Sequence, residues 1–225
     1  GLRIANHHHA VAQRLNGRMK AELPDRDLAF LPAGSDEGEA YLRDMAFALR
    51  YARENRRRMM LRFQEAVAAH LPGVAFEPEI DIHHNYAARE THFGRPVWVH
   101  RKGATSARRG ETGIIPGSMG TPSFIVRGLG NPDSFESCAH GAGRVMGRLE
   151  ACRTLRREDC DAAMRGIVFD GWRRLGADGR HRDLAGKFDL EEAPAAYKPI
   201  ESVMAAQRDL VEPVVRLRPL GVVKG

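Results

Sequence analysis

The sequence has no long apolar run. None of its segments approaches the roughly 20 consecutive apolar residues that a membrane-spanning helix needs. The first residues, from Gly1 to Asn6, also lack the apolar stretch of a secretory signal. These absences predict a cytoplasmic protein without a membrane partner.

Cysteine is scarce as well. The 225 residues include three cysteines, Cys138, Cys152 and Cys160. Their spacing matches no metal-binding knuckle, and an odd number does not form a closed disulfide framework. We therefore expect reduced thiols. The sequence also contains no internal repeat and no low-complexity tract.

Positive charge is plentiful although lysine is rare. Only five lysines are present, but lysine and arginine together number 35 against 29 acidic residues. The formal net charge of +6 and the pI near 9.6 suit a polyanionic partner such as RNA or a nucleotide. Charge alone does not establish such a partner, because many basic proteins bind neither.

Hydrophobic periodicity predicts a mixed α+β fold. Between Gly38 and His70, apolar residues recur three or four positions apart, which indicates a long amphipathic helix or a pair of helices. Short β-favouring pieces follow at 97–99, 114–115 and 124–126, separated by turn residues. Helical patterns return after Gly143 and around 193–211, before a strand-like segment at 214–223. We expect residues 1–73 to be mainly helical, 74–140 to form sheet and active-site loops, and 141–225 to form helices and a terminal strand.

A histidine pair at positions 83 and 84 is the first segment that could carry chemistry. Asp81, His83, His84 and Asn85 place two imidazoles beside a carboxylate and an amide, as in many transition-metal sites. Adjacent side chains on a strand point to opposite faces, so only one histidine is expected to enter a shared site. Spacing alone is equally compatible with surface or hydrogen-bonded histidines.

Two loops follow. The stretch 101–110 combines four cations and two hydroxyls with glycine, a composition that suits phosphate oxygens but would also suit a basic hairpin tip. The stretch 114–123 has prolines and glycines that fix a tight path and leave Ser118 and Ser123 able to form hydrogen bonds. A structural turn would explain the second loop equally well.

His140 lies in a glycine-rich segment, 137–144. Its glycines would let a phosphate approach the backbone, a following helix N-terminus would favour the anion, and Arg144 would add a guanidinium fork. In that setting a neutral His140 could attack phosphorus and form a phosphoramidate. A buried structural histidine is the alternative.

Taken together, five strings in this order resemble the RtcB family of RNA ligases. The strings are His83–Tyr86, Arg101–Gly110, Pro116–Gly120, His140–Arg144 and Val222–Gly225. The resemblance is dense from Asp81 to Arg148, looser in the helical region before it, fragmentary between Leu149 and Leu220, and close again at the last four residues. It implies the α+β fold of the family's catalytic domain, of which this chain would be the C-terminal part.

The resemblance also implies an activity. It points to a ligase that uses GTP and manganese to join an RNA 3′-phosphate or 2′,3′-cyclic phosphate end to a 5′-hydroxyl end, as in tRNA splicing and RNA repair. His140 would attack GTP to give a histidine-linked GMP, which would then activate the RNA 3′-phosphate. An accessory activating protein is a further expected partner.

The family's roles transfer to individual positions of this sequence. His140 matches the histidine that becomes guanylylated, and His84 matches a metal ligand. The positions matching those around the bound guanylate are Ser118, Ser123, Ala142, Gly143, Arg144, Tyr197 and Lys224.

The resemblance implies ligands that this sequence does not contain. Relatives carry an aspartate, a cysteine and two further histidines that complete a two-manganese site, and an asparagine and a glutamate near the nucleotide. We expect these upstream of Gly1, since the cluster at His7, His8 and His9 cannot direct three adjacent side chains to one ion. A chain without them is expected to guanylylate weakly or not at all.

Two other functions remain open from the sequence. One is a catalytically impaired fragment that binds guanine nucleotide or RNA. The other is a metal-dependent phosphatase or nuclease that uses Asp81, His83 and His84. The second leaves the His140 loop and Lys224 unexplained.

Overall fold

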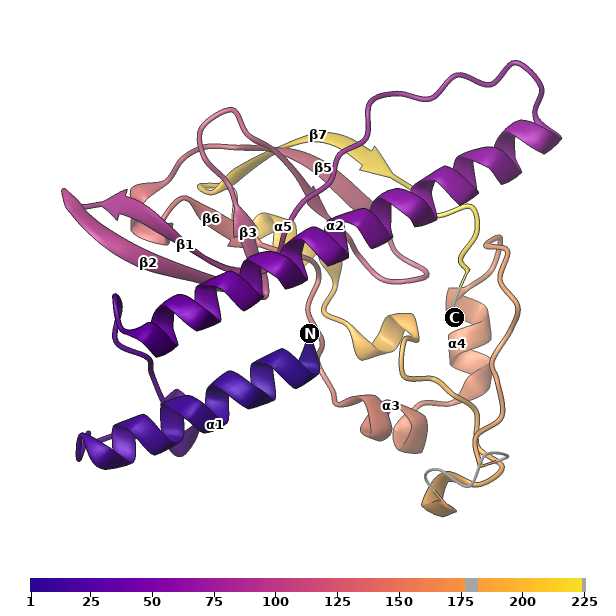
Figure 1. Cartoon of the computed structure of the whole chain (residues 1–225). Helices are drawn as coiled ribbons and strands as arrows, with labels where there is room; N and C mark the ends of the chain where they lie inside the picture. Colours follow the sequence, from indigo (N-terminus) through magenta and orange to yellow (C-terminus); the bar gives the residue numbers. More distant parts are fainter. Residues whose placement is uncertain (177–181, 224–225) are drawn as a thin grey trace. The chain divides into compact units, whose positions relative to one another are not determined.

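A computed structural model describes residues 1–176 and 182–223, and Figure 1 shows its elements in sequence order. The chain divides into two compact units, Gly1–Asp81 and Ile82–Gly225. The first contains helices, and the second contains short helices and antiparallel strands. The mixed α+β class predicted from the sequence is confirmed.

The first unit is built on two helices, α1 (Leu2–Arg18) and α2 (Asp36–His70), with the short 3-10 turn η1 (Arg26–Leu28) between them. Buried His8 on α1 lies 2.9 Å from the Asp44 carboxylate on α2. Buried Asn16 both donates to and accepts from the backbone of Phe30, which fixes the connecting segment. These polar contacts join the two helices.

The helix expected between Gly38 and His70 is confirmed as one continuous element. Ser35 caps α2 by accepting a hydrogen bond from the Gly38 N–H, and acidic residues in the first turn complement the helix dipole. Most side chains of α2 are exposed. Pairs three and four residues apart, such as Glu54 with Arg57 and Arg58, stabilise its surface.

The second unit contains three small antiparallel sheets (Figure 1). They are the hairpin β1 (Asn85–His92) with β2 (Arg95–Lys102), the pair β3 (Ala104–Ser106) with β6 (Ser137–Ala139), and the sheet β4 (Thr112–Ile115), β5 (Ser123–Gly128) and β7 (Val211–Leu217). The strand pieces predicted at 97–99, 114–115 and 124–126 are confirmed within β2, β4 and β5.

The terminal strand begins and ends earlier than predicted. It was expected at 214–223, but β7 covers Val211–Leu217 because β5, its partner, starts at Ser123 and offers no residue beyond the Ser123–Leu217 pair. Further along, Gly221 forms only an isolated bridge with Val168. Apolar β-branched residues alone did not reveal where the partner strand stops.

Short helices complete the second unit: α3 (Arg148–Thr154), α4 (Arg157–Ala163), α5 (Ile200–Ala205) and the 3-10 turns η2 (Pro132–Ser134), η3 (Arg182–Leu184) and η4 (Pro194–Ala196). The main core comprises Ala107, Ile115, Phe124, Val126, Cys138, Ala142, Ile200, Met204 and Val211. A smaller core forms around Cys160, Leu190 and Ala193.

The three cysteines are free and buried, in agreement with the expected thiols. Within the described ranges, no helix has the length and apolar character needed to cross a membrane.

Candidate functional site

His140 directly follows the three-residue strand β6 and is half-buried. Its backbone N–H donates to the carbonyl of Gly103 at 3.4 Å. A Cβ placed on Gly103 would lie 3.8 Å from both Nδ1 and Cε1 of the His140 ring. The Nδ1 edge therefore faces the Gly103 backbone, and Nε2 lies farther from it.

The structure brings His84 and His140 together. Their rings stack with centroids 5.6 Å apart and an interplanar angle of 21°. The hairpin register explains the approach, because Asn85 pairs with Lys102 and so places His84 at the same end of the hairpin as Gly103. The sequence had placed both residues in one site from family resemblance alone.

The expectation that His83 and His84 point to opposite faces assumed that both lie on a strand, and they do not. Residues 83 and 84 precede β1, which begins at Asn85, because its partner β2 ends at Lys102 and Gly103 then turns the chain with a φ of +74°. The opposite-face argument therefore does not apply to this pair. His83 instead has its ring 6.3 Å from that of Tyr86, in an edge-to-face contact.

The described residues do not by themselves form a complete metal site. Across residues 1–176 and 182–223, no three His, Cys, Asp or Glu side chains are grouped to hold an ion. Asp81, the carboxylate of the phosphatase hypothesis, is instead paired with Arg56 at 2.5 Å and with Arg53 at 3.8 Å. The geometry gives that hypothesis no support. His84 as a manganese ligand stays a prediction.

Ser118 lies in the loop between β4 and β5, and Ser123 is the first residue of β5; hydrogen bonds hold this loop in place. The Ser123 hydroxyl accepts from the Gly117 N–H at 3.3 Å, and the Thr121 hydroxyl accepts from the Ser118 N–H at 2.7 Å. Glycine is needed at 117, because a Cβ there would lie 2.1 Å from the Pro122 carbonyl oxygen. The loop therefore has a fixed shape before any ligand binds.

This serine loop is joined to the His140 loop. The Ala142 N–H donates to the Pro116 carbonyl at 2.9 Å, and Ala142 itself is part of the main core. A Cβ on Gly141 would lie 3.1 Å from the same carbonyl, so the two backbones pass close together. The backbone at Pro116 therefore lies directly against the backbone at Gly141 and Ala142.

Arg144 and Tyr197 also meet, as the resemblance implied. They form an isolated antiparallel bridge, and the Arg144 guanidinium lies 5.0 Å from the Tyr197 ring centroid. Arg144 donates to the Tyr197 hydroxyl at 3.2 Å and to the backbone carbonyls of Met146 and Glu191. The Tyr197 hydroxyl in turn donates to Glu192. Burial, followed by this hydrogen bond, raises the pKa of Tyr197.

The helix expected after Gly143 is present but begins later than the sequence indicated. Residues 141–147 form a loop, and α3 begins only at Arg148. Gly143 adopts a φ of +71° and its carbonyl accepts the Lys198 N–H at 2.9 Å, which turns the chain away from a helical path. The His140 loop therefore does not lead directly into α3, and a helix N-terminus that favours an anion at His140 stays a prediction.

The basic loop 101–110 also differs from expectation, since not all its cations face solvent. Arg101 is 1% exposed and forms a two-pronged ion pair with Glu90 at 2.6 and 2.9 Å. Arg108 pairs with the same carboxylate at 3.1 Å. Exposed Lys102 and Arg109 remain as candidates for phosphate contact. The hydrogen bond from Arg101, then that from His92, holds the pKa of Glu90 at about 2.

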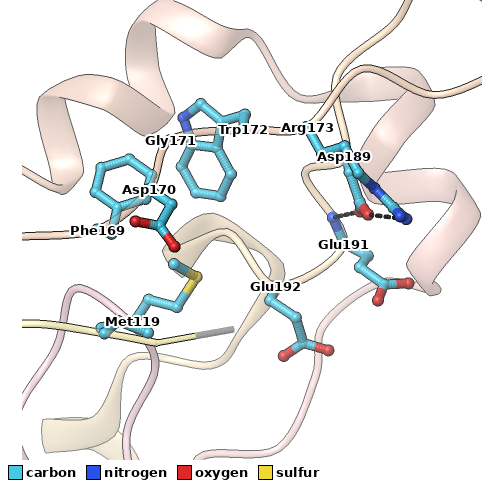
Figure 2. Close-up of a pocket in the computed structure, with 10 residues that line it drawn as sticks. Met119, Phe169, Asp170, Gly171, Trp172, Arg173, Asp189, Glu191 and Glu192 are labelled. Carbon is cyan, nitrogen blue, oxygen red and sulfur yellow. Dashed lines mark hydrogen bonds and ion pairs between the residues drawn. The ribbon is translucent and has the colours of Figure 1, made fainter. Parts of the chain in front are cut away.

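Beside the serine loop is a pocket of about 290 Å³ that sequence reasoning missed. Figure 2 shows Phe169, Trp172 and Met119 around it, with the carboxylates of Asp170 and Glu192 nearby. Met119 follows Ser118 and Glu192 bonds Tyr197, so the pocket adjoins the predicted site. The aromatic residues at 169 and 172 were the only local signal for it.

Lys224 lies outside the described residues. Val222, two positions before it, lines the pocket of Figure 2, and its N–H donates to the Val168 carbonyl at 2.8 Å. The predicted role of Lys224 therefore stays a prediction.

Comparison with known proteins gives consistent matches along the chain. A family model described as RtcB, tRNA-splicing ligase RtcB, matches residues 1–225. The RNA-splicing ligase RtcB of Escherichia coli K12 is 41% identical over 231 residues, covering 100% of this chain and 53% of the relative. The RNA-splicing ligase RtcB of Mycobacterium tuberculosis is 38% identical over 247 residues, covering 100% and 54%. The tRNA-splicing ligase RtcB of Pyrobaculum aerophilum is 34% identical over 255 residues, covering 100% and 50%. The chain thus spans about half the length of these relatives.

Proposed function

Because the chain belongs to the RtcB family of tRNA-splicing ligases, we propose that it contributes the guanylylated histidine and much of the nucleotide site of a GTP-dependent RNA ligase. The observation that carries the proposal is the convergence on His140. His84 stacks on its ring, Gly103 lies against its Nδ1 edge, and the loops containing Ser118 and Arg144 join it through backbone hydrogen bonds and a shared core.

In the proposed first step, neutral His140 attacks the α-phosphorus of GTP. A nitrogen–phosphorus bond forms, the bond to the bridging oxygen breaks, and pyrophosphate leaves with that oxygen's electron pair. The ring then loses a proton from its other nitrogen. We propose Nε2 as the nucleophile, since Nδ1 is the ring nitrogen nearer to Gly103. GMP would then pass to an RNA 3′-phosphate, and a 5′-hydroxyl would displace it.

The nucleotide would be held by the two loops next to His140. The nearby polar groups suited to phosphate and ribose are the Ala142 carbonyl, the Gly143 N–H, the hydroxyls of Ser118 and Ser123 and the cation of Lys102. The carboxylates around the pocket are hydrogen-bond acceptors. They match the N1–H and N2–H donors of guanine, whereas adenine has an acceptor at N1. This supports GTP over ATP, with Tyr197 and Lys224 as further contacts.

Manganese would neutralise charge on the phosphates when bound, and we propose His84 as one of its ligands. Among the described residues, no three metal-binding side chains are close enough together to hold an ion. A complete manganese centre would therefore need ligands in addition to His84. The RNA ends and any accessory activating protein likewise stay proposals from the family.

The test is covalent capture of labelled nucleotide by the protein as its gene encodes it. With manganese and GTP labelled at the α-phosphate, the protein should acquire a label that survives denaturation and alkali but is released by acid, as a phosphoramidate would be. His140→Ala should abolish the label. ATP labelled in the same way should give little or none.

His100→Ala is the matched control, because His100 is an exposed histidine on β2 of the same unit. It should label like the unsubstituted protein. Retained acid-labile labelling in His140→Ala would disprove the proposal. Tight, reversible GMP binding without any covalent label would instead favour a nucleotide-binding role without catalysis.

A further inference from the structure

We propose that two buried polar side chains, Arg101 and Gln207, are positioning residues that fix strand β6 and thereby the ring of His140. The proposal rests on the proposed role of His140 as nucleophile. Neither side chain is placed to contact a nucleotide, since Arg101 is 1% exposed and Gln207 is 4% exposed. Both act on the backbone that leads into His140.

Strand β6 needs such support because it is only three residues long. It pairs with β3 alone, through Ala139–Ala104, Cys138–Thr105 and Ser137–Ser106. A two-stranded pair of this length is marginal in isolation. The position of the residue that follows it must therefore be set by other contacts.

Gln207 fixes the end of β6 next to His140. Its Oε1 accepts the N–H of Ala139, the residue that precedes His140, at 3.0 Å. Gln207 follows α5 closely, and its own backbone is bonded to Met204, Leu210 and Val211. The amide therefore ties β6 to a rigid part of the main core.

Arg101 fixes the beginning of β6. Its guanidinium donates to the Ser137 hydroxyl and to the Phe135 carbonyl, both at 3.0 Å, while Glu90 holds its other face. Phe135 and Glu136 adopt φ values of 53° and 49°, a left-handed conformation that is costly for residues other than glycine. A strained pair of this kind persists only when its surroundings hold it, and Arg101 bonds directly to it.

Arg101 also acts on the other side of His140. It lies two residues before Gly103, whose carbonyl accepts the His140 N–H and where an added Cβ would lie 3.8 Å from the ring. The same guanidinium thus anchors both backbone segments that touch His140. Loss of either positioning contact should misplace the nucleophile while leaving the loops that hold the nucleotide intact.

Gln207→Met is the decisive variant, because it removes the acceptor, keeps the length of the side chain and leaves no buried charge unpaired. We expect the rate constant of His140–GMP formation at saturating GTP to fall about 10- to 100-fold, as for other small misplacements of reacting groups. The GTP concentration at half-saturation should stay within about twofold. Gln207→Glu keeps an acceptor oxygen and should recover part of the rate.

Gln64→Met on α2 is the matched control and should change neither quantity. Arg101→Lys keeps the positive charge but removes the paired N–H donors of the guanidinium. It should also reduce the rate constant of His140–GMP formation more than it changes the GTP concentration at half-saturation. Circular dichroism at the assay temperature establishes that each variant is folded. A long-range nitrogen–proton spectrum of the His140 ring should shift in Gln207→Met and not in Gln64→Met.

A folded Gln207→Met protein with an unchanged rate constant would overturn the inference. The inference would also be overturned if the rate constant fell only in proportion to the folded fraction of each variant, because that would indicate a purely structural role. If the unsubstituted protein forms no GMP adduct, the proposed function itself has failed. A shift of the His140 ring signals in Gln207→Met would then still support the positioning contact.

Discussion

Two glutamates with the same lowered pKa have opposite surroundings. Glu54 lies on the solvent-facing side of α2 and accepts hydrogen bonds from Arg57 and Arg58, and these bonds lower its pKa to about 2. Glu90 on β1 has a pKa of about 2 as well, chiefly through its bond with Arg101, but its side chain is only 6% exposed. The first belongs to a helix surface, and the second joins a hairpin to the loop that leads to His140.

The two glutamates differ in what happens to their arginine partners when the carboxylate is removed. Arginines on an exposed helix regain water when the glutamate is removed, so such pairs contribute little to stability. Arg101 cannot regain water without opening the fold, because it is 1% exposed and also bonded to Tyr86, Phe135 and Ser137. A pKa shift alone therefore does not measure the importance of an ion pair.

The largest expected effect follows from Glu90→Ala. The substitution leaves the Arg101 guanidinium buried without its partner, which typically costs about 3–5 kcal/mol of unfolding free energy. Denaturant unfolding followed by tryptophan fluorescence measures it, since Trp98 and Trp172 both lie in the second unit. Glu212→Ala, which removes an exposed partner of Arg127, is the control. Equal, small losses in both variants would contradict the comparison.

The second prediction concerns pH. Since the folded pKa of Glu90 is about 2 and its ordinary value is 4.5, its contribution to stability is complete above about pH 4.5 and is lost as the pH falls toward 2. The stability difference between the unsubstituted protein and Glu90→Gln should therefore narrow across that window. Thermal melts at stepped pH test it. A stability difference between the two proteins that stays constant down to pH 2 would show that ionised Glu90 does not contribute to stability.

The third prediction uses a network of intermediate exposure. Arg144 and Glu192 have side chains 22% and 24% exposed, and Arg144 also supports Tyr197 and the Glu191 carbonyl. Arg144→Gln should cost about 1.5–3 kcal/mol of unfolding free energy, the range of hydrogen bonds that involve charged groups, and should weaken GTP binding. Arg165→Gln, on an exposed arginine, is the matched control. Calorimetric melting and nucleotide titration measure the two effects. A loss of stability as small as that of Arg165→Gln would mean that the Arg144 network contributes no more than an exposed ion pair.

The smallest effect is expected for Glu54→Gln. In the described part of the chain, Glu54 pairs with Arg57 and Arg58 of its own helix, and both arginines are exposed. We expect no measurable change in the unfolding midpoint at physiological salt, because solvent and salt screen such pairs. A clear loss of stability would mean that this surface of α2 is more constrained than its exposure indicates.

Much of the fold followed from local patterns. Apolar spacing predicted the helix that became α2, and β-branched pieces predicted the centres of β2, β4 and β5. The limits of elements were less predictable. The end of β7 depends on where β5 begins, and the loop after His140 depends on a hydrogen bond between Gly143 and Lys198. Both are contacts between residues far apart in sequence.

The sequence by itself determined the family resemblance and predicted His140 as the central histidine, because glycine, serine and arginine around His140 form an unusual local string. Only the tertiary structure decided which charged residues are available to a ligand. Arg101 belongs to a basic loop in the sequence, yet folding buries it against Glu90, and Gln207 reaches Ala139 across 68 positions of chain. Burial and hydrogen bonding depend on partners that local sequence does not specify, so positioning residues become visible only once the chain is folded.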